Sequence, residues 1–208
     1  MRLGKLFNKY GTDKTEKHRY DIIYEKFFEP IKNDKLNILE IGVDMGQSTM
    51  AFHDYFCNST IYGIDLFERQ SKEDILPYKI NHGTYLNRCN FIKANSCLPF
   101  KDKLPDIKFD IIIDDGKHTP KANMLTFQHS INMLADNGQY FIEDVWPIED
   151  MTIIELQHQW IKTKPHAFTK YVNDQFLKVL EDSKMKIERF DHRKYSGQPD
   201  SYIIRLTK

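Results

Sequence analysis

The order of strand and helix signals constrains this chain more than any other feature. Short apolar segments, each typical of a buried strand, occur at residues 37–42, 60–65, 90–94, 109–114 and 139–142. They are apolar on both faces rather than alternating, which is typical of parallel strands covered by helices on both sides. The sequence therefore predicts an α/β fold with a mostly parallel sheet between two layers of helices.

The segments between and around these strands complete the predicted order of elements. We expect helices, in chain order, at 15–30, 46–56, 120–134, 148–162 and 170–182. Two late strands, at 184–190 and 201–206, follow each other without an intervening helix. Such a pair predicts a sheet of seven strands with one antiparallel strand at its edge. Residues 67–88 are polar and irregular, and we expect an excursion from the core there.

Length and composition limit the class of protein. A chain of 208 residues predicts one domain, residues 1–208. Thirty basic residues balance thirty acidic ones, which disfavours a general nucleic-acid binder. No apolar run is long enough to span a membrane, and the N-terminal residues lack the apolar core of a signal peptide. Three cysteines without metal-binding spacing predict reduced thiols and a cytoplasmic location.

Ligands of open parallel sheets bind beyond the carboxyl ends of the strands. The first strand ends in Gly42 and Gly46, which permit a tight turn and a close approach of a ligand to the backbone. The dinucleotide fingerprint G-x-G-x-x-G is absent, because Asp44 stands at its second glycine. A carboxylate there would repel a pyrophosphate. The turn therefore favours a nucleoside with a positive centre, such as S-adenosylmethionine (SAM), over NAD or FAD.

Polar residues also follow the second and third strands. Asp65, at the end of the second strand, is placed to accept hydrogen bonds from both hydroxyls of a ribose, although an acid here also serves as a helix cap. Asn95 and Ser96 follow the third strand and could meet the edge of an adenine, although both residue types also end strands for reasons of turn geometry.

Acidic pairs end the fourth and fifth strands, Asp114-Asp115 and Glu143-Asp144. Carboxylates that converge on one cleft require a cation or protons to offset their repulsion, and hard oxygen ligands suit Mg²⁺ or Mn²⁺. The alternative is that Asp115 caps a helix and Asp144 is simply exposed. His118 lies three residues after Asp115, and a neutral imidazole beside a metal is a competent base near pH 7.

These residues together resemble a known family. The chain is similar to metal-dependent class I SAM methyltransferases of the macrocin and mycinamicin sugar O-methyltransferase type, which are related to cephalosporin-hydroxylase-like proteins. A looser likeness is to methyltransferase domains that accompany glycosyltransferases and cap a deoxysugar such as rhamnose. The matching segments are KYGTDK at 9–14, ILEIGVDMGQS at 38–48, IYGIDLF at 61–67, FDIIIDDGKH at 109–118 and GQYFIEDVW at 138–146.

The resemblance implies a Rossmann-like class I fold in which residues 1–36 form a helical lid over a core of residues 37–208. It implies metal ligands at Asp115, Glu143 and Asp144, with His118 as general base and Asp115 also catalytic. The contacts that it implies for SAM are Thr12, Glu40, Gly42, Gly46, Ser48, Asp65, Asn95, Ser96 and Asp114. The contacts that it implies for the substrate are Asp13, His18, Tyr20 and Trp146.

The predicted activity is transfer of a methyl group from SAM to a sugar hydroxyl, with Mg²⁺ or Mn²⁺, on a glycan, glycoside or nucleotide sugar and alongside glycosyltransferases. A catechol-type small-molecule O-methyltransferase shares the same fold, cofactor and metal. A nucleic-acid methyltransferase is supported only by the basic excess of residues 162–208. A carbohydrate-binding module that kept the fold without catalysis is disfavoured, because the acidic and histidine residues above are all present.

Overall fold

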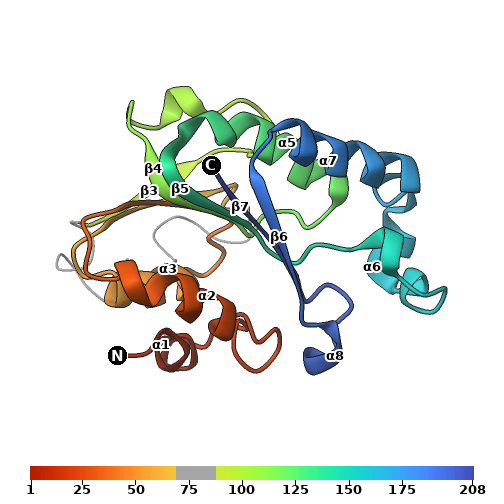
Figure 1. Ribbon diagram of the computed structural model, residues 1–208, viewed down its shortest axis with the longest axis horizontal. Coiled ribbons are helices and arrows are strands. Elements are labelled where there is room, and N and C mark those ends of the chain that lie inside the picture. The colour runs from red at the N-terminus through yellow and green to blue at the C-terminus, as the bar shows by residue number, and fades with distance from the viewer. Residues whose placement is uncertain (69–87) are drawn as a thin grey trace.

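A seven-stranded sheet in the order β3-β2-β1-β4-β5-β7-β6 forms the centre of the molecule (Figure 1). The computed structural model describes residues 1–68 and 88–208. The strands are β1 Asn37–Ile41, β2 Thr60–Asp65, β3 Cys89–Lys93, β4 Phe109–Asp114, β5 Leu134–Ile142, β6 Lys186–Asp191 and β7 Tyr202–Thr207. The strand β7 runs antiparallel to both of its neighbours, β5 and the edge strand β6, so the antiparallel strand lies one position in from the edge. The prediction of a mostly parallel seven-stranded sheet with one antiparallel strand is confirmed.

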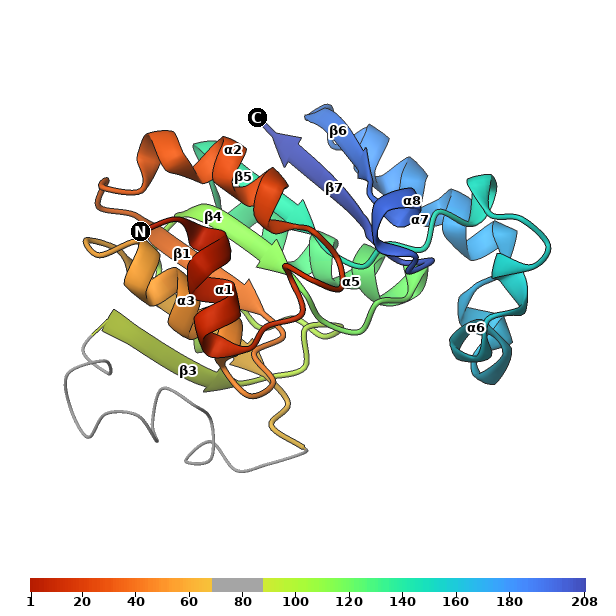
Figure 2. The ribbon, with the colours of Figure 1, turned by 90° about the horizontal axis from the view of Figure 1, so that it is seen from below.

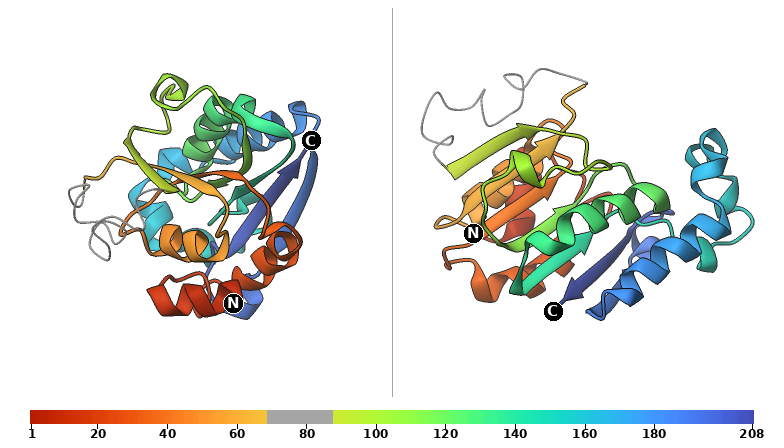
Figure 3. Two further views of the ribbon diagram at one scale, coloured as in Figure 1. Left: turned by 90° about the vertical axis from the view of Figure 1, so that its left-hand side faces the viewer. Right: turned by 90° about the horizontal axis from the view of Figure 1, so that it is seen from above.

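Helices cover both faces of this sheet, as the apolar strands predict (Figure 1, Figure 3). They are α1 Leu3–Tyr10, α2 Asp21–Phe28, α3 Gln47–Tyr55, α5 Pro120–Ser130, α6 Gln159–Thr163, α7 Lys170–Asp182 and α8 Arg193–Ser196. Figure 2 looks onto the face covered by α1, α2 and α3. The helices α5 and α7 pack on the opposite face.

Successive strand residues point to the two faces and build two separate cores. Ile38 and Ile111 belong to the cluster that contains the buried side chains of α1, α2 and α3. Leu39 and Ile112 belong to the cluster that contains Phe127 and residues of α7. Burial on both sides is the reason that these strands show no polar alternation.

The N-terminal segment, residues 1–36, differs from the single helix expected at 15–30. Arg19 adopts a left-handed φ of 61°, which interrupts a helix, so only α2 forms there and a turn precedes it. The helix α1 was not predicted. Its side chains Leu3, Leu6 and Phe7 are buried in the core, so the segment is an integral layer of the fold. Its opening as a lid stays a prediction.

The expected helix at 148–162 is also wrong. The chain forms short 3-10 turns at Ile148–Asp150 and Glu155–Gln157, and only α6 is α-helical. The carboxylate of Glu155 accepts hydrogen bonds from the backbone N–H and the hydroxyl of Thr152, and the Thr152 hydroxyl accepts one from the Glu155 backbone N–H. This reciprocal pair caps the start of the turn at Glu155–Gln157, so no continuous helix runs through Thr152. The irregular excursion expected at 67–88 lies almost wholly outside the described residues.

The other predicted elements agree with the structure within a few residues, except that β5 begins at Leu134. The turn signal at 136–138 therefore lies inside this strand. Among the residues that the structure describes, no helix is both long enough and apolar enough to cross a membrane.

Candidate active site

Four parallel strands end in register at one edge of the sheet. Ile41 pairs with Ile64 on one side and with Asp114 on the other, and Asp114 pairs with Ile142. The residues at and just beyond these ends therefore lie side by side, namely Gly42, Asp65, Asp115 and Glu143. Topology thus brings the predicted cofactor turn and the predicted metal ligands to the same edge.

The glycine turn packs directly against the acidic turn after β4. A Cβ on Gly42 would lie 2.0 Å from the backbone carbonyl oxygen of Asp115, and the φ of Gly42 is 93°. Any side chain at this position would push the two turns apart. Gly46 has a φ of 80° and forms the N-cap of α3. The absence of a side chain at Gly42 therefore lets the turn after β1 contact the turn after β4, in addition to the predicted approach of a ligand.

Asp65 holds the glycine turn in place. Its Oδ2 accepts hydrogen bonds from the backbone N–H of Val43 at 2.8 Å and of Asp44 at 3.0 Å, and its Oδ1 accepts one from Phe67 at 2.8 Å. A carboxylate oxygen accepts more than one hydrogen bond, so ribose binding by Asp65 stays a prediction. The structure adds a second role, which is to fix the turn that would contact the nucleoside.

Glu40 lies fully buried beneath the same turn. It accepts hydrogen bonds from the hydroxyls of Ser48 and Thr49, at the start of α3. Burial raises the pKa of Glu40 to about 7, although the two hydroxyls act in the opposite direction. In this position Glu40 supports the glycine turn through the start of α3. Its direct contact with a cofactor, which the resemblance implies, stays a prediction.

Asn95 and Ser96 both engage in local hydrogen bonds after β3. The Asn95 side-chain oxygen accepts from the backbone N–H of Cys97 at 3.0 Å, and Ser96 accepts from the hydroxyl of Thr126 at 2.9 Å. Asn95 is exposed and Ser96 is half-buried. Their predicted contact with an adenine stays a prediction.

Asp114 ends β4, as predicted. Its carboxylate is buried, accepts hydrogen bonds from the Asn123 side chain and the Gly116 backbone N–H, and has a pKa that burial raises to about 7. These bonds order the turn that carries Asp115. Contact of Asp114 with a cofactor stays a prediction.

Three side chains converge in front of the ends of β4 and β5. His118 Nε2 lies 3.6 Å from Asp115 Oδ1 and 3.9 Å from Asp144 Oδ2. One potential ligand atom from each residue lies within 4.8 Å of the others. All three side chains are partly exposed, so a ligand can reach them. Two carboxylates and an imidazole form a donor set that suits a divalent cation.

The backbone at this edge is strained. Asp44, His118 and Asp144 adopt positive φ angles of 44°, 34° and 50°, a region that residues other than glycine rarely occupy. Asp44 follows the end of β1, His118 follows the end of β4, and Asp144 follows the end of β5, each within four residues. Strain that surrounding contacts maintain is typical of binding and catalytic sites.

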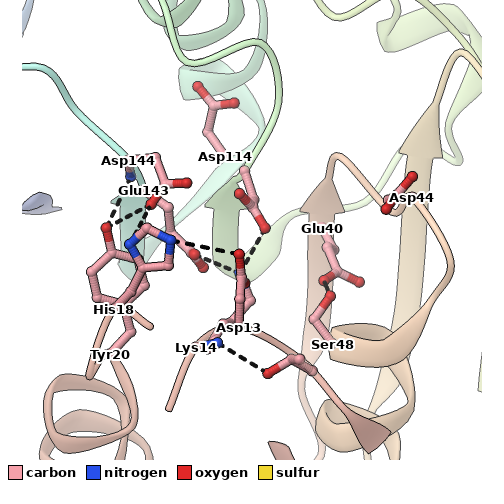
Figure 4. A network of polar contacts seen from close by, with 12 residues as sticks. Asp13, Lys14, His18, Tyr20, Glu40, Asp44, Ser48, Asp114, Glu143 and Asp144 are labelled. Carbon is pink, nitrogen blue, oxygen red and sulfur yellow. Dashed lines mark hydrogen bonds and ion pairs between the residues drawn. The ribbon is translucent and has the colours of Figure 1, made fainter. Parts of the chain in front are cut away.

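The N-terminal segment lies against the acidic residues, and in Figure 4 it approaches them from below. Lys14 Nζ contacts Asp115 Oδ2 at 2.6 Å and Glu143 Oε2 at 2.5 Å. The Tyr20 hydroxyl donates a hydrogen bond to Asp144 Oδ1 at 2.7 Å. The exposed fraction of Lys14 is 2%, and Tyr20 is fully buried. One oxygen of Asp115 and one oxygen of Asp144 are thereby fixed by residues more than 100 positions away in the sequence.

Glu143 differs from Asp115 and Asp144 because both of its oxygens have protein partners. Lys14 contacts Oε2, and the Tyr24 hydroxyl donates to Oε1. Only 1% of its side chain is exposed. Burial and the neighbouring Asp115 raise the pKa of Glu143 well above its usual range, and the positive charge of Lys14 opposes this. A carboxylate oxygen accepts more than one contact, so the metal-ligand role of Glu143 stays a prediction.

Of the predicted substrate contacts, His18 and Asp13 form a pair at the mouth of the site. His18 Nδ1 shares a hydrogen bond with Ser201 at 2.8 Å, and its Nε2 lies 3.5 Å from Asp13 Oδ2. His18 is buried and Asp13 is exposed, so Asp13 is the one that a substrate can reach. Thr12 is half-buried and accepts a hydrogen bond from the Lys14 backbone N–H at 3.2 Å.

Trp146 does not face the site. It is 2% exposed and packs between His158 and Phe168, in a small core formed by the segment after β5. The substrate contact that the resemblance implies for Trp146 has no support in this position and stays a prediction. The indole instead organises the segment that leads away from the acidic residues.

Sequence reasoning missed Lys14, Tyr24 and Ser201. Lys14 carried a signal, because it ends the KYGTDK segment, but a lysine between the polar residues Asp13 and Thr15 is typical of a surface. Tyr24 occupied an apolar helical position and gave no sign of its buried hydrogen bond. Ser201 is remote in sequence from its partner, and no local pattern indicates it.

Comparisons with known proteins agree with this geometry. Residues 39–145, about half of the chain, match the family described as "Methyltransferase domain". An 8-demethyl-8-(2-methoxy-alpha-L-rhamnosyl)-tetracenomycin-C 3'-O-methyltransferase of Streptomyces olivaceus is 24% identical over 152 residues, which cover 69% of this chain and 37% of that protein. The mycinamicin VI 2''-O-methyltransferase of Micromonospora griseorubida is 27% identical over 156 residues, 69% of this chain and 36% of that protein. The chain thus spans little more than a third of the length of these relatives.

Solved structures show the same fold. The MycE methyltransferase from the mycinamycin biosynthetic pathway, in complex with Mg, SAH and mycinamycin VI, superposes with a TM-score of 0.71. It is 21% identical, and the match covers all of this chain and 54% of that one. The sheet order, the glycine turn and the family match agree with one another. The chain belongs to the methyltransferase-domain family and has the class I fold of SAM-dependent methyltransferases.

Proposed function

We propose that this protein is a SAM-dependent O-methyltransferase that requires a divalent cation and methylates a hydroxyl of a sugar. The observation that carries the proposal is the cluster of Asp115, His118 and Asp144 next to the glycine turn. A methyl acceptor held by this cluster would lie beside a nucleoside held by the turn. Proximity and orientation of the two reactants supply much of the rate in such a transfer.

The residues at the ends of β1 and β2 fit SAM. Gly42 and Gly46 form a turn without a protruding side chain, and Asp65 lies next to it. The exposed Asp44 disfavours a pyrophosphate and tolerates the positive sulfonium centre and amino group of SAM. The complex of the MycE neighbour with SAH supports this assignment.

The residues at the ends of β4 and β5 fit Mg²⁺ or Mn²⁺. Asp115 Oδ1 and Asp144 Oδ2 both face the gap at His118, while their other oxygens are fixed by Lys14 and Tyr20. A ligand oriented through its second oxygen is typical of metal sites. When bound there, the cation would lower the pKa of a coordinated hydroxyl and stabilise negative charge on its oxygen.

His118 is placed to accept the proton of the acceptor hydroxyl. Its Nε2 faces the same gap, and its half-buried ring is held at the start of α5 by a strained backbone. A base that stands at the edge of the cation site takes the proton as the hydroxyl oxygen becomes a nucleophile. Asp115 and Asp144 would hold the cation that orients the acceptor, and His118 would take the proton of the acceptor hydroxyl at Nε2.

The acceptor class rests on the relatives. The proteins matched are named for methylation of sugars on tetracenomycin and macrolide compounds. We propose a deoxyhexose such as rhamnose, on a glycoside, glycan or nucleotide sugar, as the acceptor. The enzyme would act in the cytoplasm beside the glycosyltransferases that attach or extend this sugar.

The test is an assay of SAH formation by the purified protein with SAM, Mn²⁺ and a panel of acceptors. The panel contains rhamnosides, nucleotide deoxysugars, a catechol and a short RNA. We expect turnover with a sugar diol, none with RNA, and loss of turnover in EDTA. Turnover with the catechol alone would overturn the sugar assignment, and turnover that persists in EDTA would overturn the metal assignment.

Two variants separate the roles within the site. Asp115→Asn should abolish metal-dependent turnover, and unchanged rates would contradict its role as a ligand. His118→Ala should lose far more turnover than affinity for SAM, because the base acts on the acceptor and not on the cofactor. Equal losses in both quantities would contradict the role of His118 as the base.

A further inference from the structure

A lysine lies in the segment after each of the two strands that carry the acidic cluster. Lys117 is exposed and stands between Asp115 and His118, in the turn after β4. Lys164 is half-buried and forms the C-cap of α6, in the segment after β5. Among the residues that the structure describes, neither ammonium has an ion pair or a hydrogen bond. Both positive charges are therefore open to a ligand at the edge where the acceptor would bind.

The two ammonium groups lie within electrostatic range of each other. Burial lowers the pKa of Lys164 from its usual 10.5, and the positive charge of Lys117 lowers it further. In Figure 2, α6 lies beyond the edge at which β4 and β5 end, which is the position that brings Lys164 toward the turn after β4. Like charges at such a distance repel each other, and an anion bound between them removes this repulsion.

Lys164 is held in a defined direction by Trp160. The ammonium nitrogen lies 2.8 Å from the centre of the indole ring, a cation–π contact that orders an otherwise flexible side chain. The helix α6 is anchored in turn, because Ile161 is buried in the small core that contains Trp146 and Phe168. Lys164 thus projects from a fixed support, whereas an ordinary surface lysine is free to move.

The functional edge carries opposite charges at its two ends. The exposed Asp44 stands at the cofactor turn and disfavours a phosphate there. Lys117 and Lys164 stand at the other end, next to His118. Lysine binds phosphate as a point charge, and a phosphate monoester carries nearly two negative charges at pH 7. Two ammonium groups match this charge, whereas a carboxylate offers only one.

We propose that Lys117 and Lys164 bind a phosphoryl group of the acceptor, so that the sugar is methylated as a sugar phosphate or a nucleotide sugar and not as a neutral glycoside. Trp160 is a positioning residue, because it acts through Lys164. The inference rests on the proposed function, since it narrows the acceptor of that site. The methylation then precedes the glycosyl transfer that consumes the activated sugar.

The test compares three acceptors that contain the same sugar, namely rhamnose 1-phosphate, thymidine diphosphate rhamnose and methyl rhamnoside. SAH formation is measured with saturating SAM and Mn²⁺. The readout is the ratio of kcat/KM for a phosphorylated acceptor to kcat/KM for methyl rhamnoside. We expect a ratio of about a hundred for the better phosphorylated acceptor, whose identity distinguishes a monophosphate from a diphosphate. A ratio below about three for both would overturn the proposal.

Replacing either lysine should reduce this ratio. Lys117→Gln and Lys164→Gln should each lower it about tenfold, because each variant loses one charged contact. An effect of Lys117→Gln on the neighbouring His118 cancels in the ratio, since it lowers turnover with every acceptor. Lys162→Gln is the matched control. Lys162 is exposed on the same helix, its ammonium contacts the Gln157 side chain, and its variant should keep the ratio.

The positioning role of Trp160 has its own test. Trp160→Leu removes the cation–π contact and should lower the ratio about threefold, and Trp160→Phe should restore it because an aromatic face remains. The alternative is that Lys164 only covers the indole ring and binds no acceptor. Lys164→Gln would then leave the ratio unchanged, and that result would overturn the proposal.

A binding measurement separates this proposal from the proposed function, because it needs neither turnover nor a metal. Inorganic pyrophosphate is titrated by calorimetry into the protein with SAH and EDTA. Its affinity should fall about tenfold in Lys117→Gln and in Lys164→Gln, and should not change in Lys162→Gln. If no sugar is methylated but this loss is observed, the proposed function fails and the phosphate subsite stands. Equal affinities in the wild type and in both lysine variants would overturn the subsite.

Discussion

The two halves of the functional edge are built in different ways. In the half formed by β1, β2 and β3, the acidic side chains bind the protein close to their own strands, as Asp65 binds the backbone of Val43 and Asp44. In the half formed by β4 and β5, Asp115, Glu143 and Asp144 bind the N-terminal segment, as Asp144 binds Tyr20 across 124 positions.

We call the half at β1, β2 and β3 the preformed half, and the half at β4 and β5 the assembled half. The preformed half is complete once neighbouring parallel strands pair. The assembled half is complete only when α2 and the turn before it have packed on the sheet. Gly42 joins the two halves, because its missing side chain lets the turn after β1 contact the turn after β4. We expect mutations to affect one half, both halves or the assembly step, according to these contacts.

The largest expected effect distinguishes the chemistry of the two halves. Asp144→Asn should lower the turnover number about a thousandfold at saturating SAM, because the cation loses a charged ligand. Asp65→Asn should weaken SAM binding about tenfold and leave turnover at saturation nearly unchanged. Steady-state kinetics with varied SAM measure both quantities. Similar losses of turnover in the two variants would contradict the division of labour.

The next effect tests the junction between the halves. Gly42→Ala should lower the free energy of unfolding by more than about 3 kcal/mol, because its Cβ would lie 2.0 Å from a backbone oxygen. Gly11→Ala is the matched control. Gly11 also has a positive φ, of 73°, but no atom lies within 4 Å of its added Cβ. Its expected loss is about 1 kcal/mol. Denaturant unfolding compares the two, and equal losses would show that the turns do not depend on this close contact.

A smaller effect tests how the assembled half is put together. Tyr20→Phe removes the hydrogen bond to Asp144 and should weaken Mn²⁺ affinity about tenfold. Tyr24→Phe removes a hydrogen bond to Glu143 instead, and should change Mn²⁺ affinity by less than about threefold. Calorimetric titration measures both. The reverse order of these effects would place Glu143 closer to the cation than Asp144.

The smallest effect concerns the preformed half and depends on pH. Burial raises the pKa of Glu40 from 4.5 to about 7, so the folded protein binds this proton more tightly than the unfolded chain does. Stability from this group is therefore present at pH 4.5 and is lost as the pH rises to about 7. Glu40→Gln should remove about 2 kcal/mol of the stability change between pH 5 and pH 7. Asp114, which also has a pKa of about 7, should retain part of the slope, measured by denaturant unfolding. An unchanged slope in Glu40→Gln would show that Glu40 does not titrate in this range.

Most of the fold follows from local patterns. The strands from β1 to β5 and the helices α3, α5 and α7 appear near their predicted positions, because apolar runs and helical spacing reflect burial on the sheet. The predicted helix at 148–162 was wrong because Thr152 and Glu155 cap the start of a short turn, and the spacing of apolar residues does not reveal such a pair. The helix α1 was overlooked because its eight residues give a short signal.

The sequence by itself determined the edge at which function lies and the chemistry found there. Parallel strands that end together must bring Gly42, Asp65 and Asp115 to one place, whatever the details of packing. Only the tertiary structure decided which partners each acid has. Glu143 contacts Lys14 and Tyr24, and Asp114 accepts a hydrogen bond from Asn123. Whether a carboxylate faces a ligand or a buried partner depends on contacts between segments far apart in the chain, and no local pattern of residues records those contacts.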